Sequence, residues 1–137
     1  MPENDEIGME SESDRKISRF SYKERARSFT FALAGGRVLL TSQHNAWIHT
    51  VATVLVVVGA VIVRVSRLEW ALLILAIALV WAMEALNTAI ELLADEISQE
   101  QRQRLGKAKD VSAFGVLVAA MASVLIGLFV FIPHLFF

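Results

Sequence analysis

Three long apolar stretches limit what this chain can fold into. The first covers residues 46–63 and carries only His49, Thr50 and Thr53 as polar side chains. Its length is close to the ~20 residues that a helix needs to cross a bilayer. Two more stretches run from about 70 to 97 and from 111 to 132, where Pro133 is expected to end the last one. Because lipid offers no partners for backbone groups, runs of this kind favour helices, so the sequence predicts an all-α membrane protein with three transmembrane helices.

Composition supports a single membrane domain. The chain has 137 residues, 55% of them hydrophobic, with a net charge of −1 and no cysteine. The missing cysteines exclude disulfides, thiolate metal ligands and cysteine nucleophiles. The polar N-terminus predicts that no cleavable signal peptide is present.

The segment before the first span has two parts. Residues 1–14 are acidic and polar, which predicts a disordered tail, and residues 15–137 form the expected membrane domain. From about 15 to 40, basic side chains interleave with aromatic ones, a pattern typical of an amphipathic helix in the membrane interface. Nucleic acid is not expected as a partner, because the rest of the chain lies in lipid. Gly35 and Gly36 predict a bend or a close backbone approach.

Lysine and arginine side chains predict the orientation. Seven lie before the first span, two in the connection 64–69 and four in the segment 98–109, which is expected to be the end of a helix plus a loop. Positively charged segments stay in the cytoplasm, so the N-terminus and the second loop are expected there, at the inner membrane.

A polar stripe crosses the second span. Glu84, Asn87, Thr88, Glu91 and Asp95 share one side of a helix that is otherwise built of Ala, Leu, Ile and Met. A carboxylate inside a membrane helix costs at least ~2.5 kcal/mol, so several on one face need a cation, a proton or a polar partner. The stripe therefore predicts a functional site, although a polar seam that only joins helices is the simpler alternative. By contrast, His49 and His134 are expected to be interfacial residues rather than ligands.

Several kinds of chemistry are compatible with these residues. Carboxylates near Lys109 and Asp110 at the membrane surface suit Mg²⁺ bound to phosphates, with one carboxylate as a base and the lysine stabilising charge on the phosphoryl group. Proton-coupled transport, a metal channel or a plain scaffold fit the same pattern. A ridge of Gly115, Ala119, Ser123 and Gly127, at every fourth position, predicts a helix-packing face in the third span.

The words E-A-L-N-T-A-I-E at 84–91 and A-K-D at 108–110 resemble the signature of the prokaryotic diacylglycerol kinase and undecaprenol kinase family. Further matches are F-T-F-A-L-A-G at 29–35, N-A-W-I-H at 45–49 and V-S-R-L-E-W at 65–70, so the resemblance covers roughly residues 20–133. It implies a homotrimeric membrane enzyme that transfers the γ-phosphoryl of Mg-ATP to a lipid hydroxyl.

The resemblance also implies roles for individual residues. Glu84 is expected to be the catalytic base, Asn87 to order the site, and Glu91 to bind the metal and ATP. Glu100, Lys109 and Asp110 are expected to contact ATP.

Gln43 stands where the family usually has a second metal-binding glutamate, and the aromatic residue and arginine that usually follow are replaced by Ala46 and Trp47. These departures leave open a catalytically degenerate family member that acts as a scaffold. The wording of the motifs is closer to members that use undecaprenol than to those that use diacylglycerol.

Overall fold

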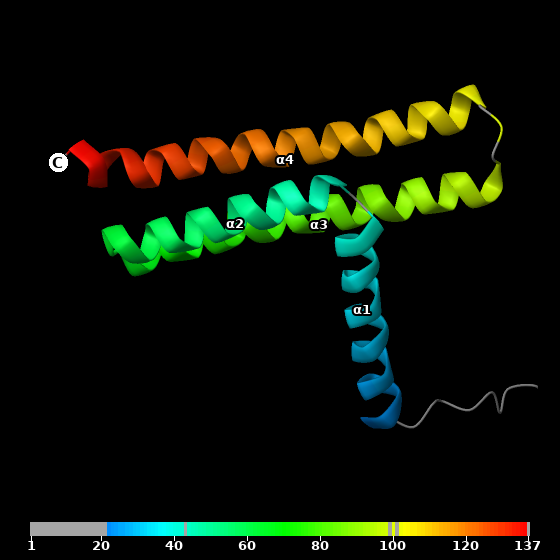
Figure 1. Ribbon diagram of the computed structural model, residues 1–137, viewed down its shortest axis with the longest axis horizontal. Coiled ribbons are helices and arrows are strands. Elements are labelled where there is room, and N and C mark those ends of the chain that lie inside the picture. Colours follow the sequence, from blue (N-terminus) through cyan, green and yellow to red (C-terminus); the bar gives the residue numbers. More distant parts are fainter. Residues whose placement is uncertain (1–21, 43, 99, 101, 137) are drawn as a thin grey trace, which may run out of the picture. The chain divides into compact units, whose positions relative to one another are not determined.

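The computed structural model describes residues 22–42, 44–98, 100 and 102–136, all of them helical apart from short connections. Four helices follow one another: α1 (Tyr22–Ser42), α2 (His44–Val63), α3 (Arg67–Ile97) and α4 (Gln103–Phe136) (Figure 1). The chain divides into two units whose boundary falls within α1, between residues 33 and 34. The predicted acidic tail at 1–14 and Gln43 lie outside the described residues.

Three of the helices, α2, α3 and α4, are long and apolar enough to cross a membrane. Large apolar side chains such as Leu75, Val124 and Phe129 are exposed along them. An exposed apolar surface of this extent is typical of a protein that contacts lipid. The predicted all-α architecture with three candidate transmembrane helices is therefore confirmed, although α2 and α3 begin two and three residues earlier than expected and α4, with 34 residues, extends well beyond the expected span on both sides.

A helix precedes the spans, as predicted. In α1 the guanidinium of Arg27 lies 5.4 Å from the centre of the Phe31 ring, a cation–π contact one turn apart. The prediction of a bend at Gly35 and Gly36 is wrong. The helix continues through both glycines, and a Cβ at either one would meet nothing within 4 Å. Twenty-one residues of continuous backbone bonding outweigh the cost of two glycines in a helix.

A tight connection joins α2 to α3. Arg64 adopts a left-handed conformation (φ 56°), and the amide of Val65 donates to the carbonyl of Ala60, so α2 ends in a Schellman motif. Ser66 then caps α3: its hydroxyl accepts from the amide of Glu69, and the Glu69 carboxylate accepts from the amide of Ser66. This reciprocal capping box explains why α3 begins three residues before the expected Trp70.

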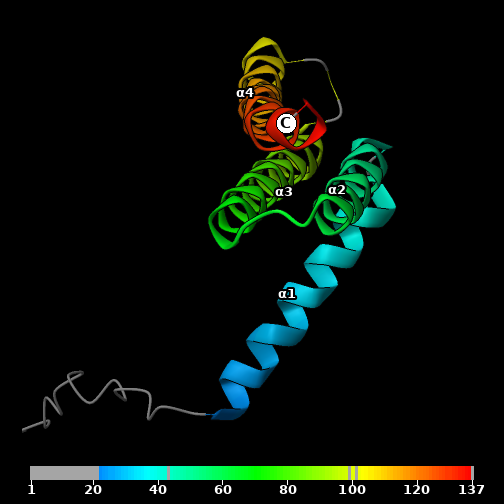
Figure 2. The same ribbon diagram turned by 90° about the vertical axis from the view of Figure 1, so that its left-hand side faces the viewer.

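The antiparallel pair of α3 and α4 forms the most extensive packing in the structure, and α2 lies beside this pair (Figure 2). Three of the four ridge residues of α4 support the predicted packing face, whereas a Cβ at the fourth, Gly127, would meet nothing within 4 Å. Ala119 is buried, Gly115 lies against Met83, and the Ser123 hydroxyl donates to the carbonyl of Ala76 over 3.1 Å. Small side chains thus allow the two helices to approach closely over several turns.

Packing at the α2–α3 connection fixes one end of the helices. Ala60, Val65, Leu73 and Val130 form a buried cluster there. At the same end, the His134 imidazole lies 3.1 Å from the Glu69 carboxylate, which ties the C-terminal part of α4 to the start of α3. The opposite end of the pair, where α3 passes into α4, carries the polar residues singled out in the sequence.

Two predicted boundaries of α4 are wrong. Pro133 does not end the helix, which continues to Phe136. A proline removes its amide donor and crowds the carbonyl one turn earlier, but in a membrane the helix still satisfies the remaining backbone groups, which lipid cannot do. The loop predicted for 98–109 is also shorter, because α4 begins at Gln103. A-K-D therefore lies in a helix, where charged side chains are accommodated on the exposed face of the first turns.

Enlarging a buried side chain of the ridge should weaken the α3–α4 pair. Ala119 is 3% exposed, so Ala119→Leu is expected to lower the free energy of unfolding in detergent micelles by about 1–3 kcal/mol through overpacking. Val118, on the exposed side of the same helix, provides the control, and Val118→Leu should leave stability within about 0.5 kcal/mol of the parent chain. Equal stability of the two variants would show that α4 does not pack on α3 through the ridge.

Candidate functional site

Glu84 is the most deeply buried charged residue that the structure describes. Its side chain is 1% exposed, and neither carboxylate oxygen has a hydrogen-bond partner among the described residues. On the neighbouring helix α2, Nε2 of His49 lies 3.8 Å from Oε2 of Glu84. This separation exceeds hydrogen-bond length but allows an ion pair when the imidazole is protonated. A buried carboxylate without a bonding partner costs stability, and such groups cluster at functional sites.

A chain of hydrogen bonds continues along α3 from the next turn. The amide nitrogen of Asn87 donates to Oε1 of Glu91 over 3.0 Å. The hydroxyl of Ser112 on α4 donates to Oδ1 of Asn87 over 2.7 Å. Asn87 is 4% exposed and Ser112 is 9% exposed, so these bonds are shielded from water. Thr88 is also buried in this stripe, and its hydroxyl has no partner among the residues described.

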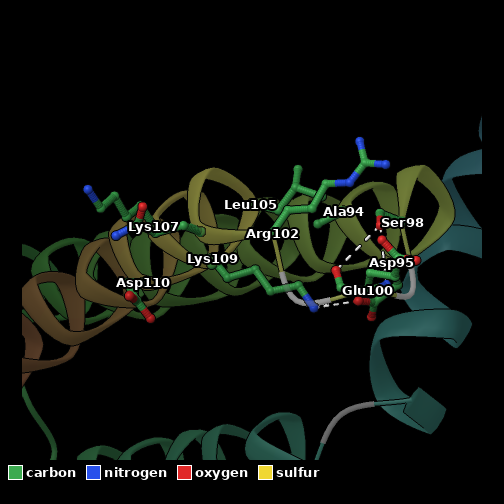
Figure 3. Close-up of a pocket in the computed structure, with 11 residues that line it drawn as sticks. Ala94, Asp95, Ser98, Glu100, Arg102, Leu105, Lys107, Lys109 and Asp110 are labelled. Carbon is green, nitrogen blue, oxygen red and sulfur yellow. Dashed lines mark hydrogen bonds and ion pairs between the residues drawn. The ribbon is translucent and has the colours of Figure 1, made fainter.

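A polar cavity of about 700 Å³ lies at the same end of the helix pair (Figure 3). It is lined by the end of α3, the connection and the first turns of α4, including Asp95, Ser98, Glu100, Lys107, Lys109 and Asp110. Lys109 reaches across to Asp95 and forms an ion pair with it, whereas the Asp110 side chain is directed away from this pair (Figure 3). The Ser98 hydroxyl accepts from the backbone amide of Glu100 and so holds the connection in place.

The predicted site residues thus fall into two neighbouring groups. Glu84, Asn87 and Glu91 lie on α3 between the helices, and Glu100, Lys109 and Asp110 line the polar cavity. Ser112 links the two groups, because its hydroxyl lies close both to Asn87 in the first group and, at 2.8 Å, to the backbone carbonyl of Lys109 in the second. Among the described residues, no three His, Asp or Glu side chains converge as ligands of a metal ion. Gln43, the other expected ligand, lies outside the residues the structure describes.

Sequence reasoning missed two residues of the site. His49 faces Glu84, a contact that its expected role as an interfacial residue did not include. The sequence clue to this position of His49 is Thr53, which lies four residues on and so shares its face of α2. The Thr53 hydroxyl accepts a hydrogen bond from the Trp81 indole over 3.1 Å, so this face of α2 is directed towards α3. Ser112 was also missed, although it lies three residues before Gly115 and so extends the small-residue face of α4 by about one turn.

An apolar cavity of about 350 Å³ lies between α2, α3 and α4. His49 contributes to its wall together with apolar side chains such as Val56, Ile77 and Phe131. A cavity of this size, mostly apolar with a few polar side chains (His49, Thr53 and Ser123), is typical of small-molecule sites. At one end the cavity reaches His49, the residue that faces Glu84.

These features define an integral membrane protein with a buried acidic site. Beside it lies a polar cavity that both basic and acidic side chains line. The family model for prokaryotic diacylglycerol kinase matches residues 30–131. The chain therefore belongs to the prokaryotic diacylglycerol kinase family, and it is a multi-pass membrane lipid kinase. Membership of a kinase family implies ATP as the co-substrate and a lipid as the acceptor. It supports the kinase interpretation over cation-coupled transport.

Individual relatives carry both acceptor names. An undecaprenol kinase of Bacillus subtilis is 33% identical over 122 residues, which cover 89% of this chain and 99% of the relative. A diacylglycerol kinase of Synechocystis is 37% identical over 79% of this chain and 62% of its own length. The diacylglycerol kinase of Escherichia coli K12 is 39% identical over 55% of this chain and 62% of its own length.

The two polar groups of α3 should respond differently to mutation. Glu84→Gln removes a buried charge that has no hydrogen bond to lose, so thermal unfolding in micelles should occur at an unchanged or higher temperature. Asn87→Ala removes the hydrogen bonds that this amide makes with Ser112 and Glu91, so it should lower the free energy of unfolding by about 1–3 kcal/mol. Equal destabilisation by the two changes would identify Glu84 as a structural residue.

Proposed function

We propose that this chain transfers the γ-phosphoryl of Mg-ATP to the hydroxyl of a membrane lipid at the cytoplasmic surface of the inner membrane. The observation that carries the proposal is Glu84, a carboxylate that the fold buries without a hydrogen-bond partner among the described residues. Such a group is suited to accept a proton from a substrate hydroxyl, because no donor in the described part of the chain competes for its oxygens. The apolar cavity beside His49 supports a lipid as the molecule that brings the hydroxyl there.

In the proposed reaction Glu84 takes the proton of the lipid hydroxyl as the lipid oxygen attacks the γ-phosphorus. The bond from the γ-phosphorus to the bridging oxygen breaks, and ADP leaves with the electron pair of that bond. His49, 3.8 Å from the carboxylate, stabilises the negative charge of Glu84 before the transfer when its ring is protonated. Asn87 keeps Glu91 in place by its hydrogen bond.

The polar cavity is the proposed nucleotide site. Within this cavity, Lys109 is the proposed contact for the transferred phosphoryl group. In the structure the ammonium of Lys109 forms an ion pair with Asp95. The phosphates of ATP would compete with that carboxylate for Lys109. Glu100 and Asp110 line the same cavity and complete the proposed ATP contacts.

The donor set suits magnesium bound together with ATP. Mg²⁺ typically takes one or two protein carboxylates and fills its remaining positions with phosphate oxygens and water. Glu91 provides one carboxylate next to the polar cavity, and Gln43 is the proposed second position, with an amide oxygen in place of a charge. When bound, the ion neutralises charge on the phosphates. The chain itself supplies the orientation of Glu91, through Asn87.

Undecaprenol is the acceptor that we favour, and a homotrimer with a cytoplasmic N-terminus is the proposed assembly. The Bacillus subtilis relative named undecaprenol kinase aligns over nearly its whole length, which supports this acceptor over diacylglycerol. The excess of Lys and Arg in the N-terminal segment and in 98–109 supports the orientation. The exposed apolar faces of the three long helices leave room for partner subunits.

Phosphoryl transfer by the purified chain tests the proposal. Labelled ATP and Mg²⁺ are supplied in mixed micelles with undecaprenol or diacylglycerol, and Glu84→Gln serves as the blank. Labelled lipid is expected from the parent chain, with undecaprenol the better acceptor, and turnover by Glu84→Gln should fall by at least about 10²-fold while the protein remains folded. No product with either lipid leads to Gln43→Glu: restored turnover would identify a degenerate kinase, and continued inactivity would contradict the proposed function.

Removal of the Lys109 charge should act on the nucleotide. Lys109→Gln is expected to raise the KM for ATP and lower kcat, together reducing kcat/KM by about 10²–10³-fold, because a cation at the transferred phosphoryl group stabilises the transition state. The KM for the lipid should stay within about twofold. Lys107→Gln, on the same turn, is the control and should have a much smaller effect on kcat/KM. Equal effects of the two lysines would indicate bulk attraction of ATP by positive charge.

A further inference from the structure

Ser112 occupies a special position between the two groups of the site. It lies on α4, one turn after Lys109, and is 9% exposed. Its hydroxyl oxygen is 2.7 Å from Oδ1 of Asn87 on α3 and 2.8 Å from the carbonyl oxygen of Lys109 on its own helix. Serines inside helices commonly bond a carbonyl of the preceding turn, but here a second acceptor from another helix lies equally close.

The chemistry of the groups fixes the direction of each bond. An ionised glutamate only accepts hydrogen bonds, so Asn87 must turn its amide nitrogen towards Glu91. The amide oxygen of Asn87 then faces Ser112, and an amide oxygen also only accepts. The hydroxyl of Ser112 therefore has to donate. Its single proton is shared between two acceptors, Oδ1 of Asn87 and the carbonyl of Lys109, and it is the hydrogen-bond donor that the structure gives this amide oxygen.

We propose that Ser112 is a positioning residue of the phosphoryl-transfer site: through the amide of Asn87 it sets the orientation in which Glu91 receives a hydrogen bond. The inference rests on the proposed function, in which Glu91 holds the metal. Partners of metal ligands orient the ligand and tune the metal, and they do so without touching substrate. The same hydroxyl lies 2.8 Å from the Lys109 carbonyl, so Ser112 also links the orientation of the Asn87 amide to the position of the first turns of α4.

Loss of the hydroxyl has a defined consequence. Without it the amide oxygen of Asn87 is buried and unpaired, which favours rotation of the amide away from Glu91. Glu91 then loses the Asn87 donor and is held less firmly. The hydrogen bonds of the Ser112 side chain go to Asn87 and Lys109 rather than to Glu84, and His49 still lies against that carboxylate, so the lipid hydroxyl should still reach it.

The experiment compares Ser112→Ala with the parent chain in micelles. The kcat is expected to fall by about tenfold while the KM for the lipid stays within about twofold. A second measurement needs no turnover: Mn²⁺ serves as the probe in place of Mg²⁺, and its binding in the presence of ADP is followed by electron paramagnetic resonance. The dissociation constant of Mn²⁺ is expected to rise by about tenfold in Ser112→Ala.

Two further variants separate positioning from general stability. Ser112→Thr keeps a hydroxyl at the same place and should restore both kcat and Mn²⁺ affinity to within about threefold of the parent chain. Ser66→Ala removes a hydroxyl that also bonds to α3, at the opposite end of the helix, and should lower stability without changing Mn²⁺ affinity.

The outcomes are distinct. Parent-like kcat and Mn²⁺ affinity in Ser112→Ala would overturn the inference, and so would equal losses in Ser66→Ala and Ser112→Ala. Failure of a folded Ser112→Thr to restore either quantity would also overturn it, because the hydroxyl would then not be the active group. If the parent chain phosphorylates no lipid, the proposed function fails separately, and the Mn²⁺ affinities still decide the role of Ser112.

Discussion

The close contact between α3 and α4 is the interaction on which the rest of the structure depends. It is apolar over most of its length, with Ala119 and Gly115 allowing the helices to approach, and it becomes polar where Ser112 donates to Asn87. Hydrogen bonds between membrane helices add specificity to packing that apolar surfaces alone provide poorly in lipid. One short stretch of helix contact therefore fixes both the register of the pair and the orientation of the amide beside Glu91.

Burial of charge follows from this arrangement. Glu84 lies buried on α3, and the basic group that the structure places against it among the described residues is His49. The fold thus accepts an unfavourable carboxylate at one point and satisfies its neighbours Asn87 and Glu91 with hydrogen bonds. With Glu84 as the proposed base and Glu91 as the proposed metal ligand, this arrangement would bring proton removal and phosphate binding together in one site.

Much of the fold could be predicted from sequence, because the length of an apolar run and the period of a helix are local properties. The three helices and the packing face of α4 followed from such patterns. The places where prediction failed depend on contacts between helices or on capping: His49 was assigned to the interface because nothing local shows which face of α2 meets Glu84, and Ser112 gains its meaning only from Asn87. The beginning of α4 at Gln103 was missed because charged residues were taken to indicate a loop. The roles of Glu91, Glu100 and Asp110 remain predictions from the family resemblance.

The most direct test of this account is a double-mutant cycle between Asn87 and Ser112, measured as the free energy of unfolding in micelles. If the two side chains form the polar contact that sets the helix pair, the single changes to alanine should be strongly non-additive, with a coupling energy of at least about 1 kcal/mol. Additivity within about 0.3 kcal/mol would show that the residues do not interact and would contradict the α3–α4 contact at the centre of the site.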